Sequence, residues 1–318
     1  MKLFENPCAF ANSPVDRAAY LRGKPDELMR LKASPTTKIA LFHKLLPFLA
    51  NASNPREIKS VIWVNGEEIA KLVPQGATEV FIGLEDGEAR FAIDISAIEK
   101  PAETQPLAGR GQFAELRMAG GTLPPGDAAM LAQAKALIDW HARHKFCANC
   151  GAPTEIAQAG YQRNCPSCKS QHFPRTDPAV IMLAIHGDNA LLGRGKQWPP
   201  TFLSTLAGFV EPGETIEEAV ARELKEEAGV EAHTVHYMWT QPWPFPSSLM
   251  IGCLAEVKGM NLKVDPDELA EARWMSRDNL LLMLEGKHPD KLMTPPPMAV
   301  AHQLMKAWAT RRAPSAVR

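Results

Sequence analysis

The chain has 318 residues, of which 45% are hydrophobic, so it is long and apolar enough for about two globular domains with cores of their own. Lysine and arginine number 35 against 36 aspartates and glutamates, and the resulting net charge of −1 gives no general sign of a polyanion partner. The sequence has neither an apolar run of the roughly 18 residues that a membrane helix needs nor an apolar segment near its start, so we expect a cytoplasmic location.

Residues 1–125 are predicted to form an α+β domain in which strands pair through tight turns. The dipeptide Asn-Gly at Asn65 and the dipeptide Asp-Gly at Asp86 both separate apolar segments, and both are typical of β-hairpins. After a stretch rich in proline and glycine, apolar residues recur at helical spacing. We therefore expect a connecting helix within residues 126–145.

Residues 146–176 carry two Cys-x-x-Cys pairs separated by fourteen residues, but too few apolar residues for a core. The paired cysteines are Cys147, Cys150, Cys165 and Cys168. This spacing predicts a tetrahedral Zn²⁺ site, and because four thiolates leave no position for water or substrate, the zinc is expected to be structural. Two disulfides or a thioredoxin-like redox pair are the alternatives, although no βαβ pattern surrounds either pair. The other cysteines, Cys8 and Cys253, are expected to pack in cores.

Residues 177–318 alternate short apolar segments, which are predicted strands, with two predicted helices. The first helix has Thr215 as its N-cap, Glu218 three residues later to complete a capping box, and Gly229 just beyond its end. The second helix is expected over residues 298–311.

The first of these helices places carboxylates where a core should be. At about 100° per residue, Ile216 and Leu224 lie on the apolar stripe of the helix, and Glu223 and Glu227 fall inside the same stripe. Buried carboxylates that lie close together are costly unless a cation lies among them or they become protonated. The simplest compensation is a divalent metal bound by these two residues and Glu226.

The segment GFVEPGETIEEAVARELKEEAGV around this helix resembles the Nudix box, the signature of the Nudix hydrolase family. The matching positions are Gly208, Glu214, Arg222, Glu223, Leu224, Glu226, Glu227, Gly229 and Val230. The resemblance implies an α/β/α sandwich with a mixed sheet over residues 177–318, and an α+β protein overall. It also implies hydrolysis of a nucleoside diphosphate linked to another group, with Mg²⁺ or Mn²⁺ bound by box glutamates. Hard cations held by carboxylates offset the charge of a diphosphate, which agrees with that role.

The catalytic group is expected to comprise Arg222, Glu223, Glu226 and Glu227. Arg222 is expected to fix a box glutamate through a bidentate ion pair. A general base is also needed, and the candidates are a box glutamate or Glu268, which lies in an acidic segment farther along the chain.

The segment TQPWPFPSS sets three prolines around Trp243 and Phe245, and the prolines should hold both rings rigidly. The rings form either a packed loop or a platform on which flat rings stack. The segment is similar to the signature SQPWPFPxS of the NADH pyrophosphatase subfamily, with Thr240 in place of Ser. The similarity extends through the four-cysteine region, FPRTDPAVI and TPPPMAVA.

This second resemblance implies positions for substrate and metal. The implied substrate contacts are Phe173, Phe209, Gln241, Pro242, Trp243, Pro244, Phe245, Pro246, Ser247, Ser248 and Ala301. The implied Mg²⁺ or Mn²⁺ ligands are Glu223, Glu227 and Glu268, with a backbone contact at Ala207.

The subfamily resemblance implies hydrolysis of NADH and NAD⁺ to nicotinamide mononucleotide and AMP, removal of NAD caps from RNA, and a homodimer. Three alternatives remain. NAD-capped RNA could be the primary substrate, the substrate could be ADP-ribose or a dinucleoside polyphosphate, or the chain could be a non-catalytic nucleotide- or nucleic-acid-binding module on a Nudix scaffold.

Overall fold

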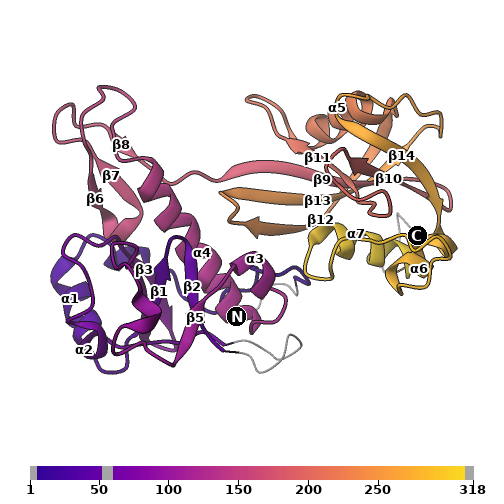
Figure 1. The fold of residues 1–318 in the computed structure, drawn as a ribbon. Coiled ribbons are helices and arrows are strands. Elements are labelled where there is room, and N and C mark those ends of the chain that lie inside the picture. Colours follow the sequence, from indigo (N-terminus) through magenta and orange to yellow (C-terminus); the bar gives the residue numbers. More distant parts are fainter. Residues whose placement is uncertain (1–5, 52–59, 312–318) are drawn as a thin grey trace. The chain divides into compact units, whose positions relative to one another are not determined.

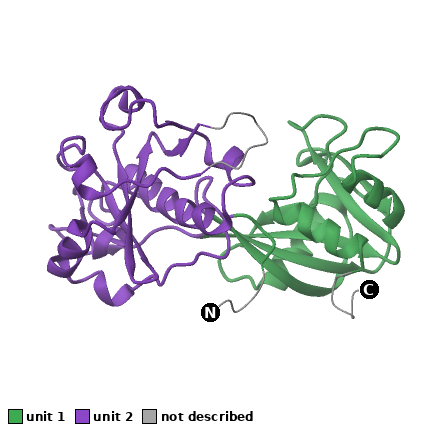
Figure 2. Cartoon of the chain, turned by 90° about the horizontal axis from the view of Figure 1, so that it is seen from below, with its two compact units in different colours: residues 1–9, 177–242, 248–318 green, residues 10–176, 243–247 purple. Residues whose placement is uncertain are grey.

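The computed structural model describes residues 6–51 and 60–311, which divide into two compact units (Figures 1 and 2). The first unit is built mainly from residues 177–311, and the second from residues 10–176. The short segment 243–247 clusters with the second unit although its neighbours along the chain belong to the first. Within the described residues, no helix is both long and apolar enough to cross a membrane.

The second unit is built on a five-stranded sheet with the order β3-β4-β1-β2-β5. Its strands are β1 (Lys38–His43), β2 (Leu46–Ala50), β3 (Glu79–Glu85), β4 (Glu88–Asp94) and β5 (Gly111–Phe113). Its helices are η1 (Ala19–Leu21), α1 (Pro25–Ala33), α2 (Gly66–Ile69), η2 (Pro101–Glu103), α3 (Leu116–Ala119) and α4 (Pro125–Arg143). Strands β1 and β4 are parallel and the other pairs are antiparallel, so this unit is a mixed α+β fold. Helix α4 begins and ends within two residues of the helix predicted over residues 126–145, and it packs on β3.

One of the two predicted hairpin turns is wrong. The Asp86 turn joins β3 to β4 as expected, with Glu85 opposite Glu88. Asn65 instead caps α2: its side-chain oxygen accepts a hydrogen bond from the Glu68 backbone N–H at 2.9 Å, and the Glu68 carboxylate accepts from the Asn65 N–H at 2.8 Å. The sequence Asn-x-x-Glu is a capping box, and burial of Ile69 favours this helical turn over a hairpin.

A small three-stranded sheet follows α4. Its elements are β6 (Glu155–Ala157), η3 (Gln158–Gly160), β7 (Gln162–Asn164) and β8 (Gln171–His172). A buried polar network joins it to α4, because Arg163 donates to the Thr154 hydroxyl and carbonyl, both at 2.7 Å, and to His141 Nδ1 at 3.1 Å. Arginine only donates, so Nδ1 accepts and the Nε2–H of His141 donates to the Gly160 carbonyl at 2.8 Å. The network therefore requires a neutral imidazole.

The free energy of unfolding of the second unit is expected to fall as the pH drops from 6.5 to 4. Burial, reinforced by Arg163, lowers the pKa of His141 from 6.5 to about 4. Between these values the unfolded chain binds a proton that the folded protein does not, so acid favours unfolding by up to about 3 kcal/mol. Urea unfolding at several pH values measures this loss. The loss should shrink in His141→Gln and persist in His144→Gln; an unchanged profile in the first variant contradicts the assignment.

The first unit is a six-stranded mixed sheet between helices. The strands are β9 (Asp177–His186), β10 (Asn189–Gly195), β11 (Leu206–Phe209), β12 (Ala232–Trp243), β13 (Ser248–Val257) and β14 (Leu269–Ser276). The helices are α5 (Ile216–Ala228), α6 (Arg277–Leu284) and α7 (Val300–Ala309). Strand β9 lies centrally, parallel to β13 and antiparallel to β10 and β11.

Alternate residues of β9 supply the two cores of this unit. Val180 and Met182 belong to the core that includes α5, whereas Ile181 and Leu183 pack with Leu304 of α7. Helix α5 therefore covers one face of the sheet and α6 and α7 cover the other (Figure 1). The predicted α/β/α sandwich is confirmed, and α7 confirms the second predicted helix with slightly shorter ends.

Candidate active site

Helix α5 forms as its sequence predicts. Thr215 and Glu218 exchange the two hydrogen bonds of a capping box, and Gly229 ends the helix in the left-handed conformation with φ of 72°. The helical wheel is confirmed as well: Glu227 is 7% exposed and the Glu223 side chain 13% exposed. Glu226 lies at the edge of the stripe with a 58% exposed side chain.

The buried carboxylates of Glu223 and Glu227 have raised pKa values, to which their neighbouring charges contribute. Burial is the main reason why the pKa of Glu227 rises to about 8, and the charges of Glu223, Glu268 and Glu226 raise it further. Burial also raises the pKa of Glu223, against the opposing effect of Arg222. Glu268, which lies outside the box sequence, thus acts electrostatically on both buried box glutamates. This group has the excess negative charge that a cation would offset.

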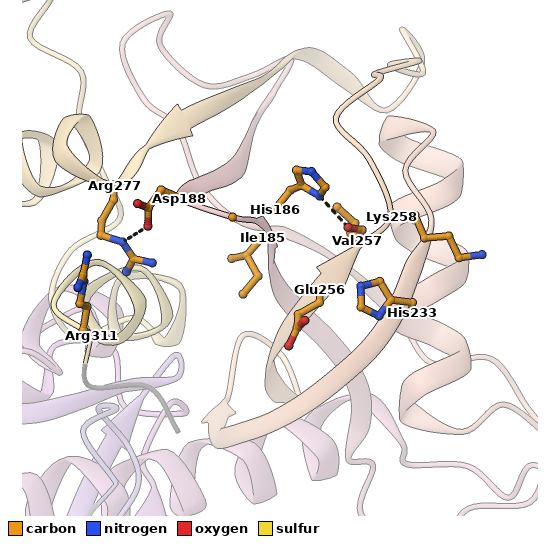
Figure 3. A pocket seen from close by; sticks show the side chains of 10 residues that line it. Ile185, His186, Asp188, His233, Glu256, Val257, Lys258, Arg277 and Arg311 are labelled. Carbon is orange, nitrogen blue, oxygen red and sulfur yellow. Dashed lines mark hydrogen bonds and ion pairs between the residues drawn. The ribbon is translucent and has the colours of Figure 1, made fainter. Parts of the chain in front are cut away.

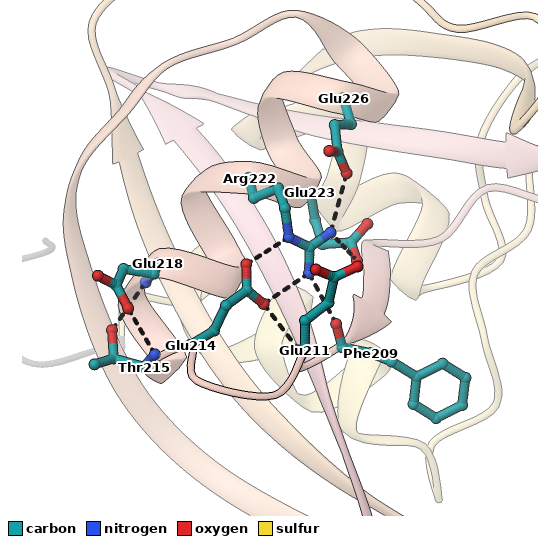
Figure 4. Close-up of polar contacts among 8 residues, drawn as sticks. All are labelled: Phe209, Glu211, Glu214, Thr215, Glu218, Arg222, Glu223 and Glu226. Carbon is teal, nitrogen blue, oxygen red and sulfur yellow. Dashed lines mark hydrogen bonds and ion pairs between the residues drawn. The ribbon is translucent and has the colours of Figure 1, made fainter.

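Arg222 organises the exposed side of this group (Figure 4). Its Nε and Nη2 donate to the two oxygens of Glu214 at 2.6 and 2.9 Å, which confirms a bidentate pair with a box glutamate. Nη1 donates to Glu223 at 2.9 Å and Glu226 at 3.0 Å, and Nη2 also reaches the carbonyl of Phe209 at 2.9 Å. The pair lowers the pKa of Glu214 to about 2, so Glu214 stays ionised and keeps Arg222 in place.

Gly208 provides the space that the Glu223 carboxylate occupies. It lies on β11 beside the exposed Ala207, and a Cβ atom at this position would overlap the Glu223 carboxylate. Steric exclusion thus explains why the box has glycine at this position: β11 and the Glu223 carboxylate lie too close together for any side chain at residue 208.

Gly208→Ala is expected to lower kcat about 100-fold, because a displacement of about 1 Å of a site residue has that effect. The matched control is Gly259→Ala in the same unit, where an added Cβ meets no atom within 4 Å. Steady-state kinetics and circular dichroism of both variants measure the effect. Normal activity in a folded Gly208→Ala variant would show that the position of Glu223 is unimportant.

The segment that carries Glu268 packs on the end of α5. Lys263 N donates to the Ala228 carbonyl at 2.9 Å, and Asp265 N donates to the Glu227 carbonyl at 3.0 Å. A Cβ on Gly229 would lie 2.7 Å from Lys263 Cβ, so the glycine both ends the helix and admits this segment. These contacts hold residues 263–265 at the end of α5, shortly before the exposed Glu268, whose charge raises the pKa of both buried box glutamates.

The four paired cysteines come together as a metal site requires. Their sulfur atoms all lie within 4.8 Å of one another and all four are free thiols, which contradicts the disulfide alternative. Two Sγ–Sγ distances are 3.5 Å, close to the edge of about 3.8 Å for tetrahedral Zn–S bonds of 2.3 Å. His172 Nε2 lies 3.2 Å from Cys147 Sγ, a contact that the sequence analysis missed. Among the described residues, the glutamates do not form an equally tight group.

The other cysteines are buried in apolar surroundings. Cys8 is 3% exposed and Cys253 is fully buried, and burial raises the pKa of each thiol to about 12. Both residues therefore pack as small apolar side chains, as expected.

The rings of Trp243 and Phe245 lie in an aromatic cluster of the second unit. Their centroids are 5.0 Å apart, and Phe10 lies at 6.0 Å from the first and 5.9 Å from the second. The guanidinium of Arg117 lies over both rings, and the ammonium of Lys135 lies over the ring of Phe245. Phe10, Arg117 and Lys135 could not be predicted as neighbours of these rings, because they are distant along the chain.

The side-chain amide of Gln241 forms hydrogen bonds with three backbone groups. Its amide nitrogen donates to the carbonyls of Ala9 at 3.1 Å and Met298 at 2.8 Å, and its oxygen accepts from the N–H of Val300 at 2.9 Å. The side chain thereby caps α7, whose own N-cap residue, Ala299, offers no side-chain acceptor. Contact between Gln241 and a substrate stays a prediction.

The remaining predicted substrate contacts differ in exposure. Phe173 and Phe209 are 62% and 61% exposed and are open to stacking, whereas Ala301 is 3% exposed in the first turn of α7. Pro244 is buried; Pro242 and Pro246 are exposed, and Ser247 and Ser248 are half-buried.

A separate cavity of about 710 Å³ in the first unit contains none of the predicted site residues (Figure 3). Arg277 at its rim pairs with Asp188 at 2.9 Å, and His186 contacts the Val257 carbonyl at 2.9 Å. Because these polar groups already have protein partners, the acidic helix remains the better candidate.

Comparisons with known proteins agree with this geometry. Residues 175–295 match the NUDIX domain family, residues 36–140 the NADH pyrophosphatase-like rudimentary NUDIX domain, and residues 142–173 the NADH pyrophosphatase zinc ribbon domain.

Similar full-length proteins point the same way. The NAD-capped RNA hydrolase NUDT12 of Homo sapiens is 36% identical over 94% of this chain and 72% of its own length. The mitochondrial NAD(P)H pyrophosphatase NUDT13 of Homo sapiens is 35% identical over 94% of this chain and 92% of its own length. The NAD-capped RNA hydrolase NudC of Stutzerimonas stutzeri is 34% identical over 86% of this chain and 90% of its own length. The rudimentary domain, the zinc ribbon and the intact box occur here in one chain, which therefore belongs to the Nudix hydrolase family, in its NADH pyrophosphatase subfamily.

Proposed function

We propose that the chain hydrolyses the diphosphate bond of NADH and NAD⁺, giving nicotinamide mononucleotide and AMP, and that it also removes NAD caps from RNA. The observation that carries this proposal is the pair of buried carboxylates on a complete Nudix helix, Glu223 and Glu227, whose pKa values the charge of the exposed Glu268 raises further. Relatives over most of the chain are named for these two activities, which supports the same substrate class.

The residues of this group suit Mg²⁺ or Mn²⁺. Carboxylate and carbonyl oxygens are hard donors, and the burial of Glu227 together with repulsion from its neighbouring carboxylates favours a bound cation. We propose Glu223, Glu226, Glu227 and Glu268 as ligands, with a backbone contact at Ala207. When bound, the cation supplies positive charge to the diphosphate and acidifies water.

The other roles fall to the chain's own side chains. Arg222 holds Glu214, Glu223 and Glu226 in a fixed arrangement, so less reorganisation is needed when substrate binds. The general base that takes the proton from water is a box glutamate or Glu268. In the segment 243–247, Trp243 and Phe245 are proposed to contact the substrate.

Product analysis by chromatography tests this function. Purified protein is incubated with Mg²⁺ or Mn²⁺ and with NADH, ADP-ribose or a short NAD-capped RNA, and reactions without added metal are the control. AMP with reduced mononucleotide is the expected result. A marked preference for ADP-ribose would reassign the substrate, and no cleavage by folded, metal-loaded protein would favour a binding module.

Two further features complete the proposal. We expect a homodimer, which light scattering after size-exclusion chromatography would detect, and the cytoplasmic location stays a prediction. The segments 1–125, 126–145, 146–176 and 177–318 are proposed as the domain division.

A further inference from the structure

A cavity of about 530 Å³ lies within the second unit beside helix α1. Four of the residues that line it, Pro25, Leu28, Met29 and Lys32, recur at helical spacing and so share one face of α1. This face is about 10 Å long, because an α-helix rises by about 1.5 Å per residue. All nine residues of α1 are described and none of them is buried, although an amphipathic helix normally buries its apolar stripe. The stripe of α1 therefore faces the cavity.

The other walls of the cavity are apolar and come from distant parts of the chain. Phe81 of β3 and Phe91 of β4 are 1% and 3% exposed, and their ring centroids lie 5.1 Å apart. The segment 156–159 forms another wall, in which Ile156 is 42% exposed. This segment is held against the sheet, since a Cβ on Gly160 would lie 2.6 Å from a side-chain atom of β3. The cavity is thus shaped by the packing of the unit.

Arg22 brings a positive charge to this cavity. Its guanidinium lies 3.3 Å from the ring centroid of Tyr161, and its Nη2 donates to the Arg17 carbonyl at 3.3 Å. Its Nε is buried and has no hydrogen-bond partner among the described residues. A buried N–H group without an acceptor is costly, and arginine is always charged. Lys32 and Glu79 also line the cavity, but they form an ion pair with each other, so Arg22 leaves the lining with a net positive charge.

We propose that this cavity binds a small organic anion with an apolar body. The body packs against Leu28, Met29 and the two phenylalanines, and the carboxylate, sulfonate or phosphate of the ligand accepts hydrogen bonds from Arg22. Cavities of roughly 300 to 1,000 Å³ with mainly apolar walls and a few polar groups are typical of ligand sites. A polar body would leave its own groups unpaired against these walls, which excludes it. The site lies within the second unit and does not depend on the proposed hydrolysis.

Fluorescence titration of the full-length protein with anilinonaphthalene sulfonate tests the site. This probe is an aromatic sulfonate whose emission rises when it leaves water. We expect saturable binding to protein whose near-ultraviolet circular dichroism is native, and displacement of the probe by decanoate, an aliphatic carboxylate. AMP is the parallel competitor. Failure of decanoate to displace the probe overturns the proposal, and displacement by AMP alone would make the cavity a nucleotide site instead.

Two substitutions locate the probe, and each has a matched control. Met29→Glu places a carboxylate at a position that is 68% exposed and should lower probe affinity about tenfold through repulsion. Met118→Glu, at a 77% exposed position of α3 in the same unit, should leave it unchanged. Arg22→Gln should also lower the affinity about tenfold by removing a charge-assisted contact. Arg30→Gln, which removes an exposed charge of α1 outside the lining, should not.

The exposure of Met29 keeps its variant informative if Arg22→Gln fails to fold. Absence of saturable binding by the wild type overturns the proposal. So does an affinity that survives Met29→Glu, or one that survives Arg22→Gln in folded protein.

Discussion

Replacing Glu227 with glutamine is expected to lower kcat about a thousandfold and to leave the fold intact. Glu227 is the most buried carboxylate of the group, and its charge is what a cation at this place would pair with. Removing one preorganised charge from such a site costs about 3 to 4 kcal/mol of transition-state stabilisation. The amide has almost the same shape and removes repulsion from Glu223 and Glu268, so the thermal midpoint should not fall. Steady-state kinetics and a thermal melt are the measurements.

The matched control for this variant is Glu217→Gln, an exposed carboxylate of the same helix that does not take part in the capping box. It should change kcat less than about twofold, in line with other surface substitutions. If Glu227→Gln turned over substrate at the wild-type rate, Glu227 would have to be removed from the proposed site.

Replacing Cys165 with serine is expected to abolish zinc binding and to unfold the ribbon. Cys165 is 1% exposed, and its segment lacks a hydrophobic core, so the metal supplies much of its folding free energy. Because apparent binding free energies of structural zinc reach about 10 kcal/mol or more in isolated fingers, the loss should exceed that of a typical core substitution. Metal analysis and limited proteolysis between residues 142 and 173 measure the two effects.

A core cysteine gives the control for this experiment. Cys253→Ala removes a buried thiol from the first unit and should leave the zinc content unchanged. Full zinc occupancy in Cys165→Ser, or a ribbon that resists protease without metal, would exclude the four-thiolate site.

The acidic helix could be predicted from sequence because its signals are local. The capping box, the glycine beyond the end and the period of 3.6 residues all lie within residues 215–229, so the burial of Glu223 and Glu227 followed from spacing alone. An ion pair between Arg222 and a box glutamate was expected. That its bidentate partner is Glu214 depends on the path of the loop before α5, which the sequence does not specify.

The wrong turn at Asn65 and the contacts that were not predicted have a common cause, which is that they depend on residues outside the local sequence. At Asn65 two local signals compete, since Asn-Gly is typical of a hairpin and Asn-x-x-Glu of a helix start, and the burial of Ile69 decides between them. The cap that Gln241 provides for α7 and the contact of His172 with Cys147 join residues that are distant along the chain. Such contacts leave no period or motif in the sequence.

The division of the chain into units restricts how the protein can be dissected. The chain passes from one unit to the other at four places, and two of them arise because the segment 243–247 interrupts a sheet of the first unit and clusters with the second. A fragment that began at residue 177 would keep α5 and its carboxylates but leave Trp243 and Phe245 without Phe10, Arg117 and Lys135. Dissection at residue 177 would therefore separate these two rings from the side chains that pack on them, although the rings and α5 lie in one stretch of sequence.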